Sequence, residues 1–88
     1  MPLIQPLAQS ADLMTGMLTR LHRSFVAPRA HATAAQAQYA RALVCRCATC
    51  PDQAGCARLQ ATMLHLDTPP DFCPNAQALM ALPPAHSD

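Results

Sequence analysis

The sequence predicts an all-α protein, and three features of it support this prediction. Apolar residues recur at the spacing of helix faces, and no stretch alternates apolar with polar residues as a half-buried strand would. Prolines and capping residues divide the chain into four short segments. Four cysteines fall at the expected ends of these segments. We therefore expect a small bundle of four short helices tied together by a four-cysteine site.

Length and composition indicate one domain with a thin core. A chain of 88 residues buries only about 60 to 65 % of its extended surface, which does not support two cores. Hydrophobic residues make up 51 % of the chain, but there is no Trp, one Tyr and two Phe, so the bulky side chains that dominate core energetics are scarce. We expect an N-terminal extension at 1–9, a single helical domain at 10–82 and a flexible tail at 83–88. A metal, a cross-link or a partner surface would supplement such a core.

The first two helices are predicted at 11–26 and 33–47. Ser10 is the expected N-cap of the first, which carries a broad apolar face formed by Leu13, Met14, Met17, Leu18, Leu21 and Phe25. Thr33 and Gln36 match a capping box at the start of the second, whose Ala, Gln and Arg residues are good helix formers. These two segments are the most regular part of the sequence.

The last two helices are predicted at 51–66 and 74–82. Pro51 and Asp52 restart the chain after the second helix, and Pro74 occupies a first-turn position of the last one. Two prolines at 83 and 84 then end the regular structure. We expect His65, near the end of the third helix, to interact with the helix dipole or to be solvated.

Charge and composition exclude several classes of function. All six basic residues are Arg and all five acids are Asp, which gives a net charge of +1. A nucleic-acid partner is not expected, because a basic footprint with stacking aromatic residues is missing. No paired carboxylates and no Ser, His and Asp arrangement emerge, and the chain has no Glu, so we predict no catalytic residue.

The N-terminal residues and the apolar runs point to a cytoplasmic protein without a membrane span. The first residues lack a basic region followed by an uninterrupted apolar run, as a secretory signal would have. No apolar run approaches the roughly 20 residues needed to cross a bilayer. In the cytoplasm, clustered cysteines indicate metal binding or redox chemistry more often than a disulfide framework.

Four cysteines form the candidate site, with the spacing Cys47-x2-Cys50-x5-Cys56-x16-Cys73. The first two lie where the second helix ends, the third lies in the first turns of the third helix, and the fourth precedes the last helix. Helix N-termini favour thiolates, the form that binds metals, so Cys56 and Cys73 are well placed. A compact bundle would bring these helix ends together. Cys45 falls on a different face of its helix and is left outside the set.

Four thiolates suit a structural zinc ion or an iron-sulfur cluster. Zinc ribbons usually present two CxxC pairs, whereas this chain has one pair and two solitary cysteines, which favours a cluster. Disulfides or redox-active thiols are a further interpretation. The run from Cys45 to Cys50 also suits Cu(I), a soft ion, but core packing explains the methionines better than thioether ligation.

The sequence resembles a family on the basis of its cysteine motifs. The pattern Arg46-Cys47-x2-Cys50, followed by Cys56 and by an FCxN run at 72–75, is similar to that of short alphaproteobacterial proteins known only as a domain of unknown function. The likeness also includes Gly16-Met17 and Tyr39 and covers nearly the whole chain. The resemblance implies an all-helical intracellular protein whose family-matching cysteines are Cys47, Cys50, Cys56 and Cys73. It implies no activity.

We therefore expect a small metal-binding protein that holds a [4Fe-4S] cluster through these four cysteines. It would serve as an electron-transfer, sensing or accessory subunit of a larger protein or enzyme complex. Asn75 and backbone amides of the last helix would donate hydrogen bonds to the cluster sulfurs. The alternatives are a zinc-stabilised interaction module and a thiol-disulfide protein that uses Cys47 and Cys50.

Overall fold

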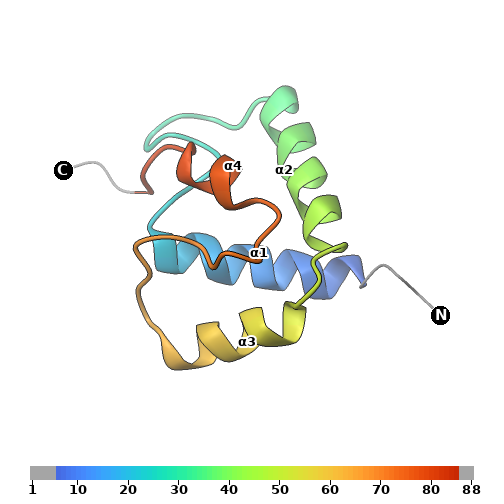
Figure 1. Ribbon diagram of the computed structural model, residues 1–88. Helices are drawn as coiled ribbons and strands as arrows, with labels where there is room; N and C mark the ends of the chain where they lie inside the picture. The colour runs from blue at the N-terminus through green and yellow to red at the C-terminus, as the bar shows by residue number, and fades with distance from the viewer. Residues whose placement is uncertain (1–5, 86–88) are drawn as a thin grey trace.

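The computed structural model describes residues 6–85 and is all-α over that range. Its helices are α1 (Leu7–Leu21), α2 (Ala34–Cys47), α3 (Gln53–Thr62) and α4 (Ala76–Met80) (Figure 1). The described residues form no strand, and one isolated β-bridge pairs Arg23 with Pro84. The predicted fold class, a small bundle of four short helices, is confirmed.

Helix α1 is the central element of the bundle. α2 and α4 lie on one side of it and α3 lies on the other (Figure 1). The residues of the buried core cluster come from α1, α2, α4 and the turn that follows α4: Met14, Met17, Leu21, Leu43, Leu79 and Leu82. The buried side chain of α3 is that of Gln53, which is polar. The contribution of α3 to the apolar core is thus limited to a partly buried side chain, that of Cys56.

The predicted start of the first helix is wrong, because Ser10 does not cap it. α1 begins at Leu7, three residues before Ser10, so residues expected to form an extension belong to the helix. The Ser10 side chain is completely buried and its hydroxyl donates to the Pro6 carbonyl oxygen at 3.0 Å. It also accepts a hydrogen bond from Gln53 at 3.0 Å. The Ser10 side chain, which the sequence pattern predicts as an N-cap, thus forms a tertiary contact with Gln53 instead.

The predicted end of the first helix is also too late. α1 ends at Leu21 because His22 adopts the left-handed conformation, with φ of 56°. The next amide, that of Arg23, then donates back to the Leu18 carbonyl at 3.0 Å, which closes the helix as a left-handed C-terminal turn does. Phe25, expected on the helix face, instead packs against the core from the following loop.

Helix α2 agrees with the sequence prediction at both ends. The Thr33 hydroxyl accepts a hydrogen bond from the Gln36 amide at 3.1 Å, and the Gln36 side chain accepts one from the Thr33 amide at 2.8 Å. This reciprocal pair is the expected capping box. The helix ends at Cys47, as predicted.

Helices α3 and α4 are both shorter than predicted. Asp52 caps α3 by accepting from the Gly55 amide at 2.8 Å. The helix ends at Thr62 rather than near residue 66, because Met63 is extended and the Leu66 amide bonds to the Arg20 carbonyl at 2.9 Å. α4 spans Ala76–Met80 instead of 74–82, because residues 73–76 form a turn closed by the Ala76 amide and the Cys73 carbonyl at 3.2 Å, and the Leu82 amide bonds only three positions back, to the Leu79 carbonyl, at 3.2 Å.

The segment after α4 returns to the end of α1. The Ala85 amide donates to the His22 carbonyl at 2.8 Å, and the Ser24 amide donates to the Pro83 carbonyl at 3.0 Å. Residues 83–85, the start of the predicted tail, are thus hydrogen bonded to the loop that follows α1. The remaining predicted tail residues, 86–88, and residues 1–5 of the predicted extension lie outside the described range. Among the described helices, none combines the length and the apolar character that a bilayer span requires.

Replacement of a core leucine tests this packing. Leu43 is 1 % exposed in the core, whereas Leu64 is 90 % exposed. Leu43→Ala should lower the free energy of unfolding by about 2 to 5 kcal/mol, because it removes buried methyl groups and leaves a cavity. Leu64→Ala is the matched control and should change it by less than about 0.5 kcal/mol. Urea denaturation followed by circular dichroism measures both, and equal effects would contradict the packing described.

Candidate metal centre

The four candidate cysteines lie on three connected parts of the chain. Cys47 is the last residue of α2, Cys50 lies in the turn that leads to α3, and Cys56 lies in α3 itself. Cys73 lies in the turn that precedes α4. Cys47, Cys56 and Cys73 pack against the apolar core, and all four side chains are half-buried. Each occupies the place relative to the helices that the sequence predicts.

Local backbone geometry turns the chain so that these cysteines approach one another. The Cys50 amide donates to the Cys47 carbonyl at 2.9 Å, which bends the chain back immediately after α2. The Cys50 thiol lies 4.0 Å from the Phe72 carbonyl oxygen. This contact brings the turn after α2 next to the residue that precedes Cys73. Segments more than 20 positions apart in the sequence therefore meet at the thiols.

The pKa of Cys47 is raised by its surroundings at the site. Burial and the neighbouring thiolates together raise the pKa of the Cys47 thiol from 9.0 to about 11, and burial has the largest effect. The thiolates that oppose its ionisation are those of Cys50, Cys56 and Cys73. The ionisation of Cys47 is thus disfavoured by each of the other three thiols, and its protonated state is the stable one at neutral pH.

Burial and neighbouring thiolates also raise the pKa values of Cys56 and Cys73, and hydrogen-bond donors partly oppose this rise. Burial raises the pKa of Cys56, and a hydrogen bond from the Gln60 side chain opposes this rise. Burial also raises the pKa of Cys73, and the backbone amide of Asn75 opposes it. Both pKa values are raised further by the Cys50 thiol. The site therefore combines mutual repulsion with hydrogen-bond donors directed at individual sulfurs.

The side-chain arrangement differs from a preformed site for a single metal ion. Between residues 6 and 85, no group of three or more His, Cys, Asp or Glu side chains is arranged to hold a metal ion. Four sulfurs around one zinc ion at 2.3 Å would lie only about 3.8 Å from one another. The thiols of Cys50, Cys56 and Cys73 thus act electrostatically on Cys47 without the four forming such a cage, and metal binding by them stays a prediction.

Two glutamines of α3 reach the sulfurs, and the sequence interpretation missed both. Gln60 donates to the Cys56 sulfur at 3.4 Å and to the Leu13 carbonyl at 2.9 Å. Gln53 donates to the Cys47 carbonyl at 2.8 Å, and its amide nitrogen lies 3.9 Å from the Cys47 sulfur. Gln60 follows Cys56 by four positions, which places both on one helix face, and this spacing is the signal that identifies it in the sequence.

Gly16 of α1 makes room for Gln60. A Cβ atom at this position would overlap the amide oxygen of Gln60. Any larger residue would therefore push away the side chain that donates to the Cys56 sulfur. The absence of a side chain at position 16 is thus required for the geometry of the site rather than for a turn.

Arg20 lies one turn further along α1 and binds the last turn of α3. Its guanidinium donates to the Gln60 carbonyl at 2.7 Å and to the Met63 carbonyl at 2.8 Å. A cation at a helix C-terminus interacts favourably with the exposed carbonyls and the helix dipole. The same positive charge lowers the pKa of Cys56, although burial has the larger effect in the opposite direction.

Asn75 contributes to the site through its backbone rather than its side chain. Its backbone amide hydrogen bonds to Cys73. Its side-chain nitrogen donates to the Leu43 carbonyl at 2.8 Å, and the expected hydrogen bonds to cluster sulfurs stay a prediction. The side chain is 1 % exposed, and its oxygen has no partner among the described residues. Asn75 therefore anchors the Cys73 turn to α2.

These observations can be compared with known proteins. A family model described as a family of unknown function (DUF6455) matches residues 1–85. The chain belongs to this family. The predicted resemblance to a family of unknown function is thereby confirmed. Searches of curated proteins and of solved structures gave no match.

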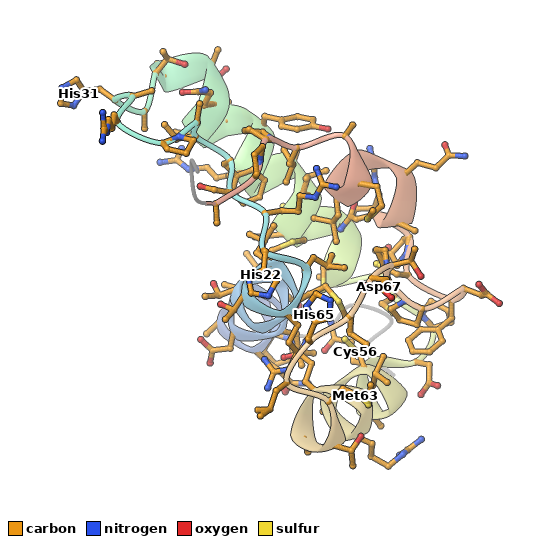
Figure 2. All side chains as sticks on the ribbon, turned by 90° about the vertical axis from the view of Figure 1, so that its left-hand side faces the viewer. His22, His31, Cys56, Met63, His65 and Asp67 are labelled. Atoms are coloured by element: carbon orange, nitrogen blue, oxygen red, sulfur yellow. The ribbon has the colours of Figure 1, made fainter. Side chains whose placement is uncertain are left out.

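Within this member of the DUF6455 family, Cys45 and His65 both have exposed side chains. Cys45 is exposed on α2, consistent with its exclusion from the set. His65 lies beyond the end of α3, and its side chain is 59 % exposed, which agrees with the solvated alternative of the prediction. Its Nε2 atom lies 3.0 Å from an Asp67 carboxylate oxygen, and its ring centre is 5.0 Å from that of His22. Figure 2 shows these rings side by side, with His31 far from them.

The raised thiol pKa values predict how the stability of the metal-free protein depends on pH. In the unfolded chain a cysteine ionises near 9.0, whereas Cys47 in the folded state ionises near 11. Below pH 9.0 the Cys47 thiol is protonated in both the folded and the unfolded state, so its full contribution to the free energy of unfolding is present. Between these pH values the unfolded state loses protons that the folded state retains, and stability falls as pH rises.

Urea denaturation of reduced, metal-free protein at a series of pH values measures this dependence. The unfolding midpoint should decrease from pH 9 toward pH 11, the interval set by Cys47. A Cys47→Ala variant should show a shallower decrease, and Cys45→Ala is the exposed control. A midpoint that rises across this interval would contradict the assigned pKa direction.

Proposed function

We propose that the protein is a small iron-sulfur protein in which Cys47, Cys50, Cys56 and Cys73 hold the cluster. The observation that carries the proposal is the meeting of four half-buried thiols, in which those of Cys50, Cys56 and Cys73 all lie close enough to Cys47 to oppose its ionisation. Buried thiolates that repel one another need cations to compensate their charge, and iron in a cluster supplies it. The proposal assigns the protein to the cytoplasm, where cysteines stay reduced.

One observation favours a cluster over a single zinc ion. The sequence has one CxxC pair and two solitary cysteines. Zinc ribbons instead usually present two CxxC pairs.

The hydrogen-bond donors around the thiols fit the same proposal. Gln60 donates to Cys56, and the Asn75 backbone amide donates to Cys73. Hydrogen bonds to ligand sulfurs stabilise their negative charge and raise the reduction potential of a cluster. The protein would then serve as an electron-transfer, sensing or accessory subunit, and we propose a larger protein or enzyme complex as its partner.

A zinc-stabilised interaction module is the second candidate function. An apolar groove of about 460 Å³ lies between α1 and α2, and the residues that line it include Leu7, Ala11, Ala40 and Val44. Such a groove suits a partner surface. Structural zinc contributes on the order of 10 kcal/mol to folding, which would compensate for the thin core.

A thiol-disulfide function is the third candidate, and the pKa of Cys47 argues against it. The attacking group in disulfide exchange is a thiolate. With a pKa of about 11, Cys47 is almost entirely protonated at neutral pH. Catalytic CxxC pairs have the opposite property, a first cysteine with a lowered pKa.

Metal analysis of anaerobically purified protein, combined with its visible spectrum, distinguishes the three candidates. We expect a brown protein that contains iron and acid-labile sulfide. Cys56→Ser should retain less than about a tenth of the iron, because loss of a ligand removes several kcal/mol of binding. Cys45→Ser is the control and should retain all of it.

The other outcomes each identify an alternative. A colourless protein with one equivalent of zinc, which unfolds on chelation, would overturn the cluster and support the interaction module. Metal-free protein with a native disulfide between Cys47 and Cys50, found by thiol counting, would support the third candidate.

A further inference from the structure

Helix α3 is held in the bundle by little apolar packing. It lies on the opposite side of α1 from α2 and α4 (Figure 1). Its buried side chain is that of Gln53, which is polar, and its contact with the core cluster is made by the half-buried Cys56. Helices α2 and α4, in contrast, each place a leucine in the core that is 1 % exposed, Leu43 and Leu79. Burial of apolar surface therefore favours the attachment of α3 less than that of the other helices.

Hydrogen bonds attach α3 to α1 near both of its ends. Near the start, the Gln53 side chain donates to the Ser10 hydroxyl at 3.0 Å. Near the end, the Arg20 guanidinium donates to the Gln60 carbonyl at 2.7 Å and to the Met63 carbonyl at 2.8 Å. Water can replace each of these partners when the helices separate, so the net contribution of such bonds to stability is modest. The attachment is thus specific in geometry but weak in free energy.

The chain is anchored to the bundle on both sides of α3. Before the helix, the Cys50 amide donates to the last carbonyl of α2 at 2.9 Å. After it, the Leu66 amide donates to a carbonyl of α1 at 2.9 Å, and the Leu66 side chain packs against the core. Between α3 and this second anchor, Met63 and Leu64 are 43 % and 90 % exposed. Residues 51–64 therefore form a segment that can leave α1 while its two anchors stay in place.

We propose that α3 is a detachable helix, which opens from α1 as one unit, residues 51–64, while α1, α2 and α4 stay packed. The helix has ten residues, and isolated helices shorter than about 12 residues are marginal in water, so it unfolds once it is detached. Such an opening is a local unfolding that costs less free energy than unfolding of the whole domain. It carries Cys56 out of the core, so access to this thiol is controlled by the attachment of α3. The opening requires no bound metal.

Hydrogen exchange of the full chain, reduced and freed of metal by chelation, tests the opening. The amides of residues 57–62 bond within α3, and those of residues 38–47 bond within α2. After correction for intrinsic rates, the α3 amides should exchange together and at least about tenfold faster than the most protected amides of α2. Equal protection of the two helices would overturn the proposal.

Arg20→Gln tests the attachment at the end of α3. Loss of the guanidinium should speed exchange of the α3 amides at least about fivefold and leave those of α2 unchanged. Arg23→Gln is the matched control, because the Arg23 guanidinium donates to the Leu82 carbonyl at 2.8 Å, beyond α4. It should leave exchange in α3 unchanged. Equal acceleration of α2 and α3 by Arg20→Gln, or equal acceleration of α3 by the two variants, would contradict a local opening.

Ser10→Ala tests the attachment at the start of α3 through the thiols of the same metal-free protein. Under native conditions, iodoacetamide should label Cys56 at least about threefold faster than in the wild type, because each opening exposes this thiol. Cys73 should keep its wild-type rate, because the Asn75 side chain fixes its turn to α2 through the 2.8 Å bond to the Leu43 carbonyl. Comparison of each thiol with itself removes differences in thiolate content. Equal acceleration of both thiols, or none at Cys56, would overturn the proposal.

Discussion

The fold depends on the polar attachment of α3 to α1. Helix α3 has no buried apolar side chain and packs against the core cluster only through the half-buried Cys56, so burial of apolar surface contributes little to its position. Instead, Gln53 bonds to Ser10, Gln60 bonds to the Leu13 carbonyl, and Arg20 bonds to the last turn of α3. Hydrogen bonds are directional and costly to leave unmade when buried, so they fix the register of the two helices more closely than a smooth apolar face would.

The same side chains connect the fold to the thiols. Gln60 reaches both α1 and the Cys56 sulfur, and Gln53 reaches both Ser10 and Cys47. Any displacement of α3 therefore changes the surroundings of two cysteines at once. Conversely, a group that binds the four thiols would tie α3 to the turns after α2 and before α4. This connection would add stability to a protein whose core contains few bulky side chains.

The sequence predicts those features that local interactions determine. The capping box at Thr33 and the end of α2 at Cys47 depend on residues within a few positions of each other, and both are correct. The placement of the cysteines near helix ends follows from these boundaries. That the four thiols act as one site stays a prediction.

The sequence could not predict features that depend on distant parts of the chain. Ser10 has the residue type of an N-cap, but its side chain is buried against Gln53, 43 positions away. α1 ends early because His22 adopts a left-handed conformation that residue type does not require. α3 ends early because the chain after it bonds to Arg20. In each case a tertiary contact overrides local helix propensity.

The central claim is that Cys47, Cys50, Cys56 and Cys73 act as one ligand set and that Cys45 does not belong to it. Differential alkylation of the protein as purified with its metal, before and after removal of the metal, tests this claim most directly. We predict that a brief treatment labels only Cys45 in the loaded protein. Removal of the metal should then make all four remaining cysteines more reactive together. Labelling of any one of the four at the rate of Cys45 in the loaded protein, or protection of Cys45 with them, would contradict the account.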